Sequence, residues 1–547
     1  MQSILARSLN TEKMLVALIM LCITPAFFLY LGLQPFIPDE AIRALVAQEM
    51  IHSGDYITPT LGGDAYLKKP PLYNWFIVMS FQLSGRQNEF FMRLPMLIFL
   101  FLFTFSIFKL LQKERGRKQA LLVALLFLTN GRILFYESLH GLIDTAFSWL
   151  VFLLFILSYQ LMQRRQYLYM YLVSYGLMAL GYLMKGLPSL VFIGITMLVL
   201  HAMHRKLKML FSWQHLIGIA FMALILGSYY LAYFSRNPIA PGEVFSVLLG
   251  ETTRRTALRF GWWAMVKNIF VFPFNMFYHF LPWSILVIPM LNKKVIRALW
   301  NDHFMRYCAL IILFNIIPYW LSPEVHPRYV LMFVPLYLTM AISVYYTPDQ
   351  HTAVLTKWIE RVFGIVLILA SILVWTPVFI EPTRNFDHIL LISLSLFVAL
   401  ALVTLAYYRL NQYRLLLLVL AMLIVRIGLN LTVLPARALL ATSFESRRLA
   451  QQTAALTQGS PLYVWWNPEK KLDPYYGRKR TAYSFMVYAN AVRGDRVEFS
   501  STRKEDAYYL ARKTDFSPRE AYVVKRLYPA EEAKDLYLIK FFPHAVD

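Results

Sequence analysis

The chain has 547 residues, of which 58% are hydrophobic and only 16% are charged. A soluble protein of this length would carry about a quarter charged residues, so the composition excludes an ordinary soluble globular protein. On a soluble protein, the net charge of +23 would suggest a nucleic-acid partner. Here most Lys and Arg lie in short loops between apolar blocks, so no nucleic-acid partner is expected.

The apolar residues occur in blocks about 20 residues long, the length that crosses a bilayer as a helix. Lipid offers no partner to backbone N–H and C=O groups, so these blocks must be helical. We therefore expect an all-α polytopic membrane bundle of about thirteen transmembrane helices. The expected spans are 14–34, 91–111, 118–135, 141–161, 167–184, 187–203, 214–234, 274–291, 307–321, 328–346, 359–378, 388–408 and 414–433.

Basic residues indicate the orientation of this bundle. They are concentrated in alternate loops, at 109–118, 164–165, 205–208, 293–297 and 409–414. Short basic loops stay in the cytoplasm, so we expect a cytoplasmic N-terminus. An odd number of spans then places the C-terminus on the outer side of the membrane.

Three long segments are expected on that outer side. They are the first loop at 34–90, a second loop at 235–272, and a tail at 437–547 that follows a transmembrane domain at 1–436. The second loop carries Arg254 and Arg255, whose charge suits an anionic ligand. The tail is predicted to be a small soluble α/β domain. It has a helix from Ser443 to about Leu456 and five segments of β-type composition, at 462–466, 496–500, 506–511, 521–528 and 536–542.

The first loop is predicted to contain two interfacial helices. Asp39 and Glu40 begin a stretch, running to about His52, whose apolar residues have the spacing of an amphipathic helix. A second apolar segment, 72–83, begins after two prolines and is too short to span a bilayer.

Ionisable groups of this loop are expected at the depth of the lipid headgroups, where such groups are usually functional. A carboxylate there can take a proton from an acceptor hydroxyl, and a lysine such as Lys68 or Lys69 can hold a lipid phosphate. Two simpler interpretations stay open. Asp39 and Glu40 can cap the helix that follows them, and the two lysines can bind ordinary anionic headgroups.

Other motifs give weaker indications. Lys185 with Gly186, between two expected spans, is either a simple turn or a contact to a donor phosphate. The histidines lack zinc-binding spacings, so no metal site is expected from them. The sequence contains no P-loop, dinucleotide-binding or serine-hydrolase motif, which fits a lipid-linked rather than a nucleotide-linked substrate.

Three motifs of the first loop carry a family resemblance: PDEA at 38–41, SGDYITPTLGG at 53–63 and YLKKPPLYNW at 66–75. They resemble the first periplasmic loop of the bacterial 4-amino-4-deoxy-L-arabinose lipid A transferases, which are related to the protein mannosyltransferases within glycosyltransferase superfamily C. Weaker matches follow at HGLIDTAFSWL (140–150), LPWS (281–284) and SPEVHPRYVLMFVPL (322–336). The resemblance covers nearly the whole chain.

The resemblance implies roles for individual residues. Asp39, with Glu40 beside it, matches the candidate catalytic base, and Asp144 is a plausible second acid. Lys69 matches the lysine that faces the donor phosphate, and Arg254 or Arg255 matches a phosphate-facing arginine; Arg328 of the matching SPEVHPRY segment is placed with them. Tyr66 and Tyr329 match tyrosines that line the same cavity, next to Lys68.

The sequence departs from the family pattern at two positions. The family glutamate before the phosphate-facing lysine is Lys68 here, and the arginine after PDEA is Ile42. That glutamate is linked in the family to a metal and to recognition of the charged amino sugar. No metal site is therefore predicted, and a divalent metal cofactor is doubtful. A neutral or acidic sugar suits Lys68 at least as well as an amino sugar.

The resemblance implies an inverting glycosyltransferase of the bacterial inner membrane. Its donor would be a sugar, hexosyl or pentosyl, linked to polyprenyl (undecaprenyl) phosphate. Its acceptor would be lipid A or another envelope glycan or glycolipid on the periplasmic side. Three alternatives stay open: a protein O-glycosyltransferase, a non-enzymatic transporter or flippase of lipid-linked sugars, and a membrane assembly protein without chemistry.

Overall fold

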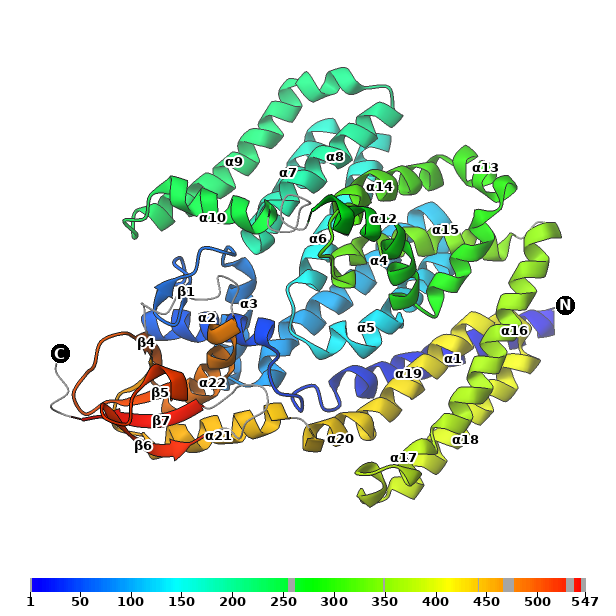
Figure 1. Cartoon of the computed structure of the whole chain (residues 1–547). Coiled ribbons are helices and arrows are strands. Elements are labelled where there is room, and N and C mark those ends of the chain that lie inside the picture. The colour runs from blue at the N-terminus through cyan, green and yellow to red at the C-terminus, as the bar shows by residue number, and fades with distance from the viewer. Residues whose placement is uncertain are drawn as a thin grey trace. The chain divides into compact units, whose positions relative to one another are not determined.

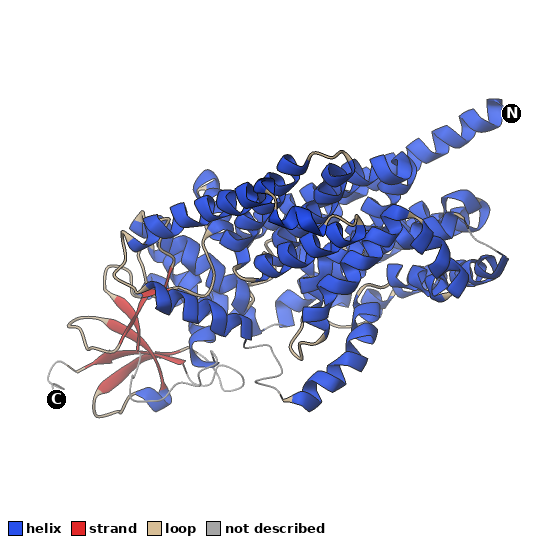
Figure 2. Ribbon diagram, turned by 90° about the horizontal axis from the view of Figure 1, so that it is seen from above, coloured by secondary structure: helices blue, strands red, loops and turns tan. Residues whose placement is uncertain are grey.

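The computed structural model describes residues 2–253, 261–347, 350–440, 442–465, 477–527 and 536–542. Helices make up most of this part of the chain, and the tail contains the one larger sheet found in it (Figures 1 and 2). The predicted fold class, a polytopic helical membrane bundle with a small α/β tail, is confirmed.

The chain forms two compact units. The first, called here the membrane unit, comprises Met1–Leu31, Lys68–Pro70 and Met96–Ala436. The second, the loop–tail unit, comprises Gly32–Leu67, Pro71–Pro95 and Arg437–Asp547. The first loop thus folds with the tail, except for the short segment that contains Lys68 and Lys69.

The membrane unit is built from helices that follow one another along the chain (Figure 1). Its helices are α1 (Gln2–Phe28), α4 (Glu89–Leu128, whose first turns belong to the loop–tail unit), α5 (Gly131–Phe135), α6 (Asp144–Gln163), α7 (Tyr167–Lys185), α8 (Pro188–Met203), α9 (Trp213–Phe234), α10 (Pro241–Thr253), α12 (Trp262–His279), α13 (Lys293–Asn301), α14 (His303–Trp320), α15 (Val334–Tyr346), α16 (Gln350–Leu373), α17 (Thr376–Phe379), α18 (Ile389–Arg409), α19 (Arg414–Leu431) and α20 (Val433–Leu440). Short 3₁₀ segments include Glu137–Leu139, Trp283–Leu291 and Pro327–Phe333.

Within the described residues, nine helical segments are long and apolar enough to cross a membrane. The sequence predicts about thirteen because each apolar block of sufficient length is taken as a separate span. The segment Glu89–Phe135 is counted once among the nine, although Gly116, whose φ is +78°, divides it into two helices that correspond to the expected blocks 91–111 and 118–135. The block at 274–291 is divided between α12 and a 3₁₀ segment, and α8 has only 16 residues.

Helix α6 forms the core of the membrane unit around the candidate site. It packs against α7, α8 and the 3₁₀ segment Pro327–Phe333, and most of its side chains are buried. Asp144 lies at its first position and Lys185 at the last position of α7. The packing of apolar helices therefore brings the polar ends of α6 and α7 together.

The loop–tail unit begins with the two helices expected in the first loop, α2 (Pro38–Ser53) and α3 (Leu72–Ser84). Between them lies a hairpin of β1 (Thr60–Leu61) and β2 (Asp64–Ala65). Its two-residue turn consists of Gly62 and Gly63, both at positive φ, as tight hairpins require. The buried Glu49 carboxylate accepts the N–H groups of both glycines, at 2.5 and 3.4 Å, and fixes the hairpin against α2.

The tail contains all five predicted strands and the predicted helix. These are α21 (Thr442–Leu456), β3 (Leu462–Trp465), β4 (Glu498–Ser500), β5 (Tyr508–Arg512), β6 (Ala521–Arg526) and β7 (Leu536–Phe541), together with a helix that was not predicted, α22 (Gly477–Arg493). The strand order is β4-β3-β5-β7-β6. β3 is parallel to β4 and β5, whereas β7 is antiparallel to β5 and β6.

Tyr488 on α22 links the tail to the first loop. Its hydroxyl accepts the N–H of Phe36 at 2.9 Å and donates to the Glu89 carboxylate at 2.8 Å, both in buried surroundings. Nearby, the Gln48 side-chain amide of α2 donates to the Val487 carbonyl of α22 at 3.1 Å. The tail is therefore packed against the loop segment that contains Asp39.

Replacing Tyr488 by Phe is expected to destabilise the loop–tail unit by about 1–3 kcal/mol, because a buried N–H and a buried carboxylate lose their partner. Thermal unfolding of the purified protein measures this. Tyr508→Phe is the matched control, since its hydroxyl makes no hydrogen bond within the described residues. Equal unfolding temperatures for both variants would contradict the role of Tyr488.

Candidate active site

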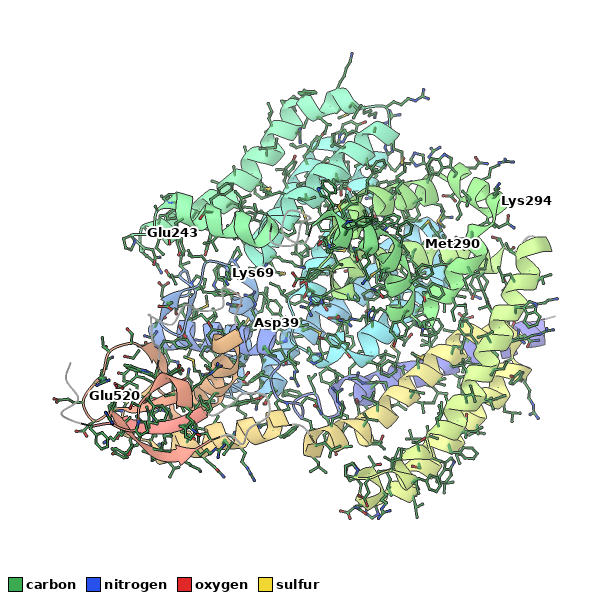
Figure 3. The ribbon with its side chains drawn as sticks, viewed as in Figure 1. Asp39, Lys69, Glu243, Met290, Lys294 and Glu520 are labelled. Atoms are coloured by element: carbon green, nitrogen blue, oxygen red, sulfur yellow. The ribbon has the colours of Figure 1, made fainter. Side chains whose placement is uncertain are left out.

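A cavity of about 410 Å³ lies within the membrane unit. The charged residues that line it are Lys68, Lys69, Lys185 and Glu324. The segment that carries Lys68 and Lys69 (marked in Figure 3 by Lys69) is the part of the first loop that belongs to this unit. With three lysines and one carboxylate, the lining carries an excess of positive charge.

Asp144 lies behind this lining in a buried ion cluster. One carboxylate oxygen accepts the Lys185 ammonium at 2.6 Å, and the other lies 3.1 Å from the Arg328 guanidinium. Lys69 is near enough to act electrostatically on the same carboxylate. Since one acid meets three cations, the cluster has a net charge of about +2, which suits a phosphate group.

Aromatic rings surround the Lys185 ammonium. Its nitrogen lies 4.8 Å from the centre of the Phe147 ring and 4.5 Å from that of Tyr329. Tyr329 in turn lies beside Tyr319, with ring centres 6.3 Å apart. Such rings attract a cation and exclude water. The Lys185 ammonium is therefore held in one position, next to which a phosphate could bind.

A second buried acid lies close to this cluster. The Glu137 carboxylate accepts the Arg132 guanidinium at 2.7 Å. Burial raises the pKa of Glu137 to about 7, because Arg132 and Arg328 offset the loss of hydration only in part and Asp144 opposes ionisation further. The charge beside the phosphate-binding cluster therefore changes near neutral pH.

The structure brings together five of the residues singled out in the sequence. Lys68, Lys69 and Tyr329 line the cavity, and Asp144 and Arg328 form the ion cluster behind it. Arg254 and Arg255 lie outside the described residues.

The remaining predicted residues belong to the loop–tail unit. Asp39 lies in the first turn of α2 and is half-buried (Figure 3). The ring of Tyr66 lies 5.6 Å from the Arg43 guanidinium carbon. These two side chains belong to the same folded unit as the tail.

Glu40 has structural partners. Its carboxylate, which is fully buried, accepts two hydrogen bonds from Arg93 at 2.8 and 2.9 Å and one from the N–H of Ile37 at 3.1 Å. The bond from the Ile37 N–H caps α2, which is the structural interpretation that the sequence leaves open for Asp39 and Glu40. A carboxylate that already accepts three hydrogen bonds has little capacity left to take a proton from an acceptor hydroxyl.

The cavity lining does not fit a divalent metal. A metal ion needs several carboxylate, carbonyl, imidazole or thiolate ligands, whereas three of the four charged residues here are lysines. Within the described ranges, no group of three or more His, Cys, Asp or Glu residues is placed to hold a metal ion. No step of the chemistry is therefore assigned to a metal.

Three residues of the site are not assigned by the sequence alone. For Lys185 the sequence leaves a simple turn and a contact to a donor phosphate open, although a lysine at the end of an apolar span is itself a sign of function. Asn315 is a polar residue inside the apolar block 307–321, which is a sign of the same kind. Glu324 lies in the matched segment 322–336, but nothing in the sequence alone shows that it lines a cavity.

Comparison with known proteins agrees with these features. Residues 68–231 match the family model of dolichyl-phosphate-mannose-protein mannosyltransferases. An uncharacterized protein of Aquifex aeolicus is 25% identical over 50% of this chain and 54% of its own length. The undecaprenyl phosphate-alpha-4-amino-4-deoxy-L-arabinose arabinosyl transferase of Shewanella sediminis is 34% identical over 20% of each chain. The chain thus spans about half, or less, of the length of these relatives.

The fold is shared over nearly the whole chain. The crystal structure of ArnT from Cupriavidus metallidurans bound to undecaprenyl phosphate has a TM-score of 0.67 to this chain at 17% identity, and covers 97% of this chain and 98% of its own. The apo structure of the same protein gives 0.65 at 18% identity. The resemblance expected from the first loop is confirmed: in sequence and in fold, this chain is similar to the 4-amino-4-deoxy-L-arabinose transferases and, through the matched model, to the protein mannosyltransferases.

Proposed function

We propose that the protein is a glycosyltransferase that takes a sugar from a polyprenyl phosphate donor. The observation that carries this proposal is the cluster of Lys69, Lys185 and Arg328 around the buried Asp144, at the wall of a cavity large enough for a sugar phosphate. Its positive charge suits the phosphate of such a donor. The shared fold with a protein whose structure contains undecaprenyl phosphate supports the same donor class.

The proposed reaction is a single displacement. The acceptor hydroxyl attacks the anomeric carbon of the donor sugar, and the bond from that carbon to the phosphate oxygen breaks. Asp39 takes the proton of the hydroxyl, and polyprenyl phosphate leaves with the electron pair of the broken bond. Lys69 and Lys185 stabilise the charge that develops on this phosphate. Attack from the face opposite the phosphate inverts the anomeric carbon.

The acceptor is proposed to be lipid A or another envelope glycan or glycolipid. The transferred sugar is a hexosyl or pentosyl group. We propose further that the protein lies in the bacterial inner membrane with its N-terminus in the cytoplasm, because the basic loops alternate along the chain. The first loop and the tail are then periplasmic, where such acceptors are exposed.

Replacing Lys69 by Ala is expected to weaken the binding of undecaprenyl phosphate by about tenfold to a hundredfold, since one charge-assisted hydrogen bond to the phosphate is lost. Titration of the purified protein in nanodiscs with undecaprenyl phosphate measures the change. Lys69→Arg should restore part of the affinity.

Lys293→Ala is the matched control, because Lys293 is exposed on α13 and does not line the cavity. An unchanged dissociation constant for the Lys69→Ala protein would contradict a phosphate at this cluster, and with it the proposed donor site.

A further inference from the structure

Two hydrogen-bond acceptors in the cavity wall have no donor among the described residues. Asn315 is 1% exposed, and its side-chain N–H donates to the Ile311 carbonyl at 3.0 Å. This bond fixes the orientation of the amide, so its oxygen is the atom left without a donor. A buried acceptor without a donor is costly, unless a ligand supplies the donor.

Glu324 is the second acceptor. It is half-buried in the segment between α14 and Arg328, and it is the one acid among the described residues that line the cavity. Its carboxylate makes no ion pair or hydrogen bond with any described residue. By contrast, Glu40, Glu137 and Asp144 all have basic partners.

These acceptors lie a short distance from the phosphate-binding lysines. The Lys185 ammonium lies over Tyr329, and Tyr329 lies beside Tyr319. Asn315 is one helical turn from Tyr319 on α14 and so faces the same side of that helix. Glu324 is four residues before Arg328, which contacts Asp144. Aromatic rings thus lead from Lys185 towards Asn315, and Glu324 lines the same cavity.

The polarity of the lining matches a sugar phosphate. A phosphate offers only acceptors and suits the lysines, whereas the hydroxyl groups of a sugar offer donors and suit an amide oxygen and a carboxylate. A cationic sugar would meet repulsion from three lysines, and an acidic sugar would meet repulsion from Glu324. A neutral sugar avoids both.

We infer that Asn315 and Glu324 form the sugar-binding subsite of the cavity and accept hydrogen bonds from the hydroxyl groups of a neutral donor sugar. This inference rests on the proposed function, because it takes the phosphate of the same donor to lie at Lys69 and Lys185. It assigns to the two residues a role in recognising the sugar, separate from that of the lysines in holding the phosphate.

The test compares two lipids that differ only in the sugar, undecaprenyl phosphate and undecaprenyl phosphate-glucose, with the full-length protein in nanodiscs. Glu324→Gln and Asn315→Leu are each expected to weaken binding of the glucose-linked lipid by about tenfold and to leave binding of undecaprenyl phosphate unchanged. Lys69→Ala should weaken both. Glu243→Gln is the matched control, because Glu243 is exposed on α10 and outside the cavity (Figure 3).

Asn315 is buried and its replacement changes packing, so Glu324→Gln decides alone if Asn315→Leu fails to fold. If Glu324→Gln weakens the binding of both lipids equally, or of neither lipid, the sugar-binding subsite is overturned. The donor-phosphate site at Lys69 would not be affected by that result. Failure of the wild-type protein to bind either lipid would overturn the proposed function, and the subsite with it.

Discussion

Exchange of Asp39 for Asn is expected to lower turnover of a lipid-linked sugar by about 10²–10⁴-fold, the usual contribution of a general base. Asn is chosen because it has nearly the size and shape of Asp but is not a base at neutral pH. The hydrogen bond from the Ile37 N–H to Glu40, which caps α2, is left in place by this exchange. Turnover is measured in membranes with a radiolabelled undecaprenyl phosphate-sugar, at matched expression levels.

The control for this experiment is Asp64→Asn, an exposed acid on β2 of the same folded unit. It should turn over the donor at the wild-type rate. Should the Asp39→Asn protein also turn over the donor at the wild-type rate, Asp39 is not the base, and another group must accept the proton.

Replacing Asp144 by Ala is expected to destabilise the membrane unit by about 3–5 kcal/mol, because the buried Lys185 and Arg328 would both lose the carboxylate that they contact. This loss of stability should lower the unfolding temperature of the purified protein. Binding of undecaprenyl phosphate should change as well, since the lysine loses the partner that positions it.

A second replacement separates charge from packing. Lys185→Met in the Asp144→Ala protein removes one of the two buried cations that contacted Asp144 and should restore part of the stability. The matched control is Glu381→Ala, which removes an exposed ion pair with Arg384 and should cost at most about 1 kcal/mol. Losses of equal size for Asp144→Ala and Glu381→Ala would show that the buried cluster is not held by charge.

The elements that local sequence patterns specify could be predicted. Helices α2 and α3 follow from the spacing of apolar residues and from the prolines before them. The five strands of the tail follow from runs of aromatic and β-branched residues. In each case, the residues that decide the structure are neighbours in the sequence, so no knowledge of distant contacts was needed.

Helix α22 shows where such patterns are insufficient. Its buried residues run almost without interruption from 482 to 490, because the helix packs against both α2 and α21. A helix that is covered on more than one side loses the periodic alternation that marks an amphipathic helix. The hydrogen bonds of Tyr488 could not be predicted for a different reason, because they join residues that lie 452 and 399 positions apart in the chain.

The ion cluster could be predicted only in part. Asp144, Lys185 and Arg328 each stand out as ionisable residues at the edges of apolar blocks. Their pairing depends on how α6, α7 and the segment 327–333 pack, since Lys185 is 41 residues from Asp144 in the chain. Asn315 and Glu324 also depend on how distant segments pack, so they could be identified as cavity-lining acceptors only in the structure.

The measurement that tests the central proposal most directly is donor consumption. Purified full-length protein is incubated with a panel of undecaprenyl phosphate-linked sugars and a bacterial envelope lipid extract, and the lipids are analysed by mass spectrometry. We predict that at least one donor is consumed, with release of undecaprenyl phosphate and addition of the sugar to an envelope lipid. Recovery of every donor intact, with the same lipids carried across the bilayer of proteoliposomes, would contradict a transferase and indicate a transporter.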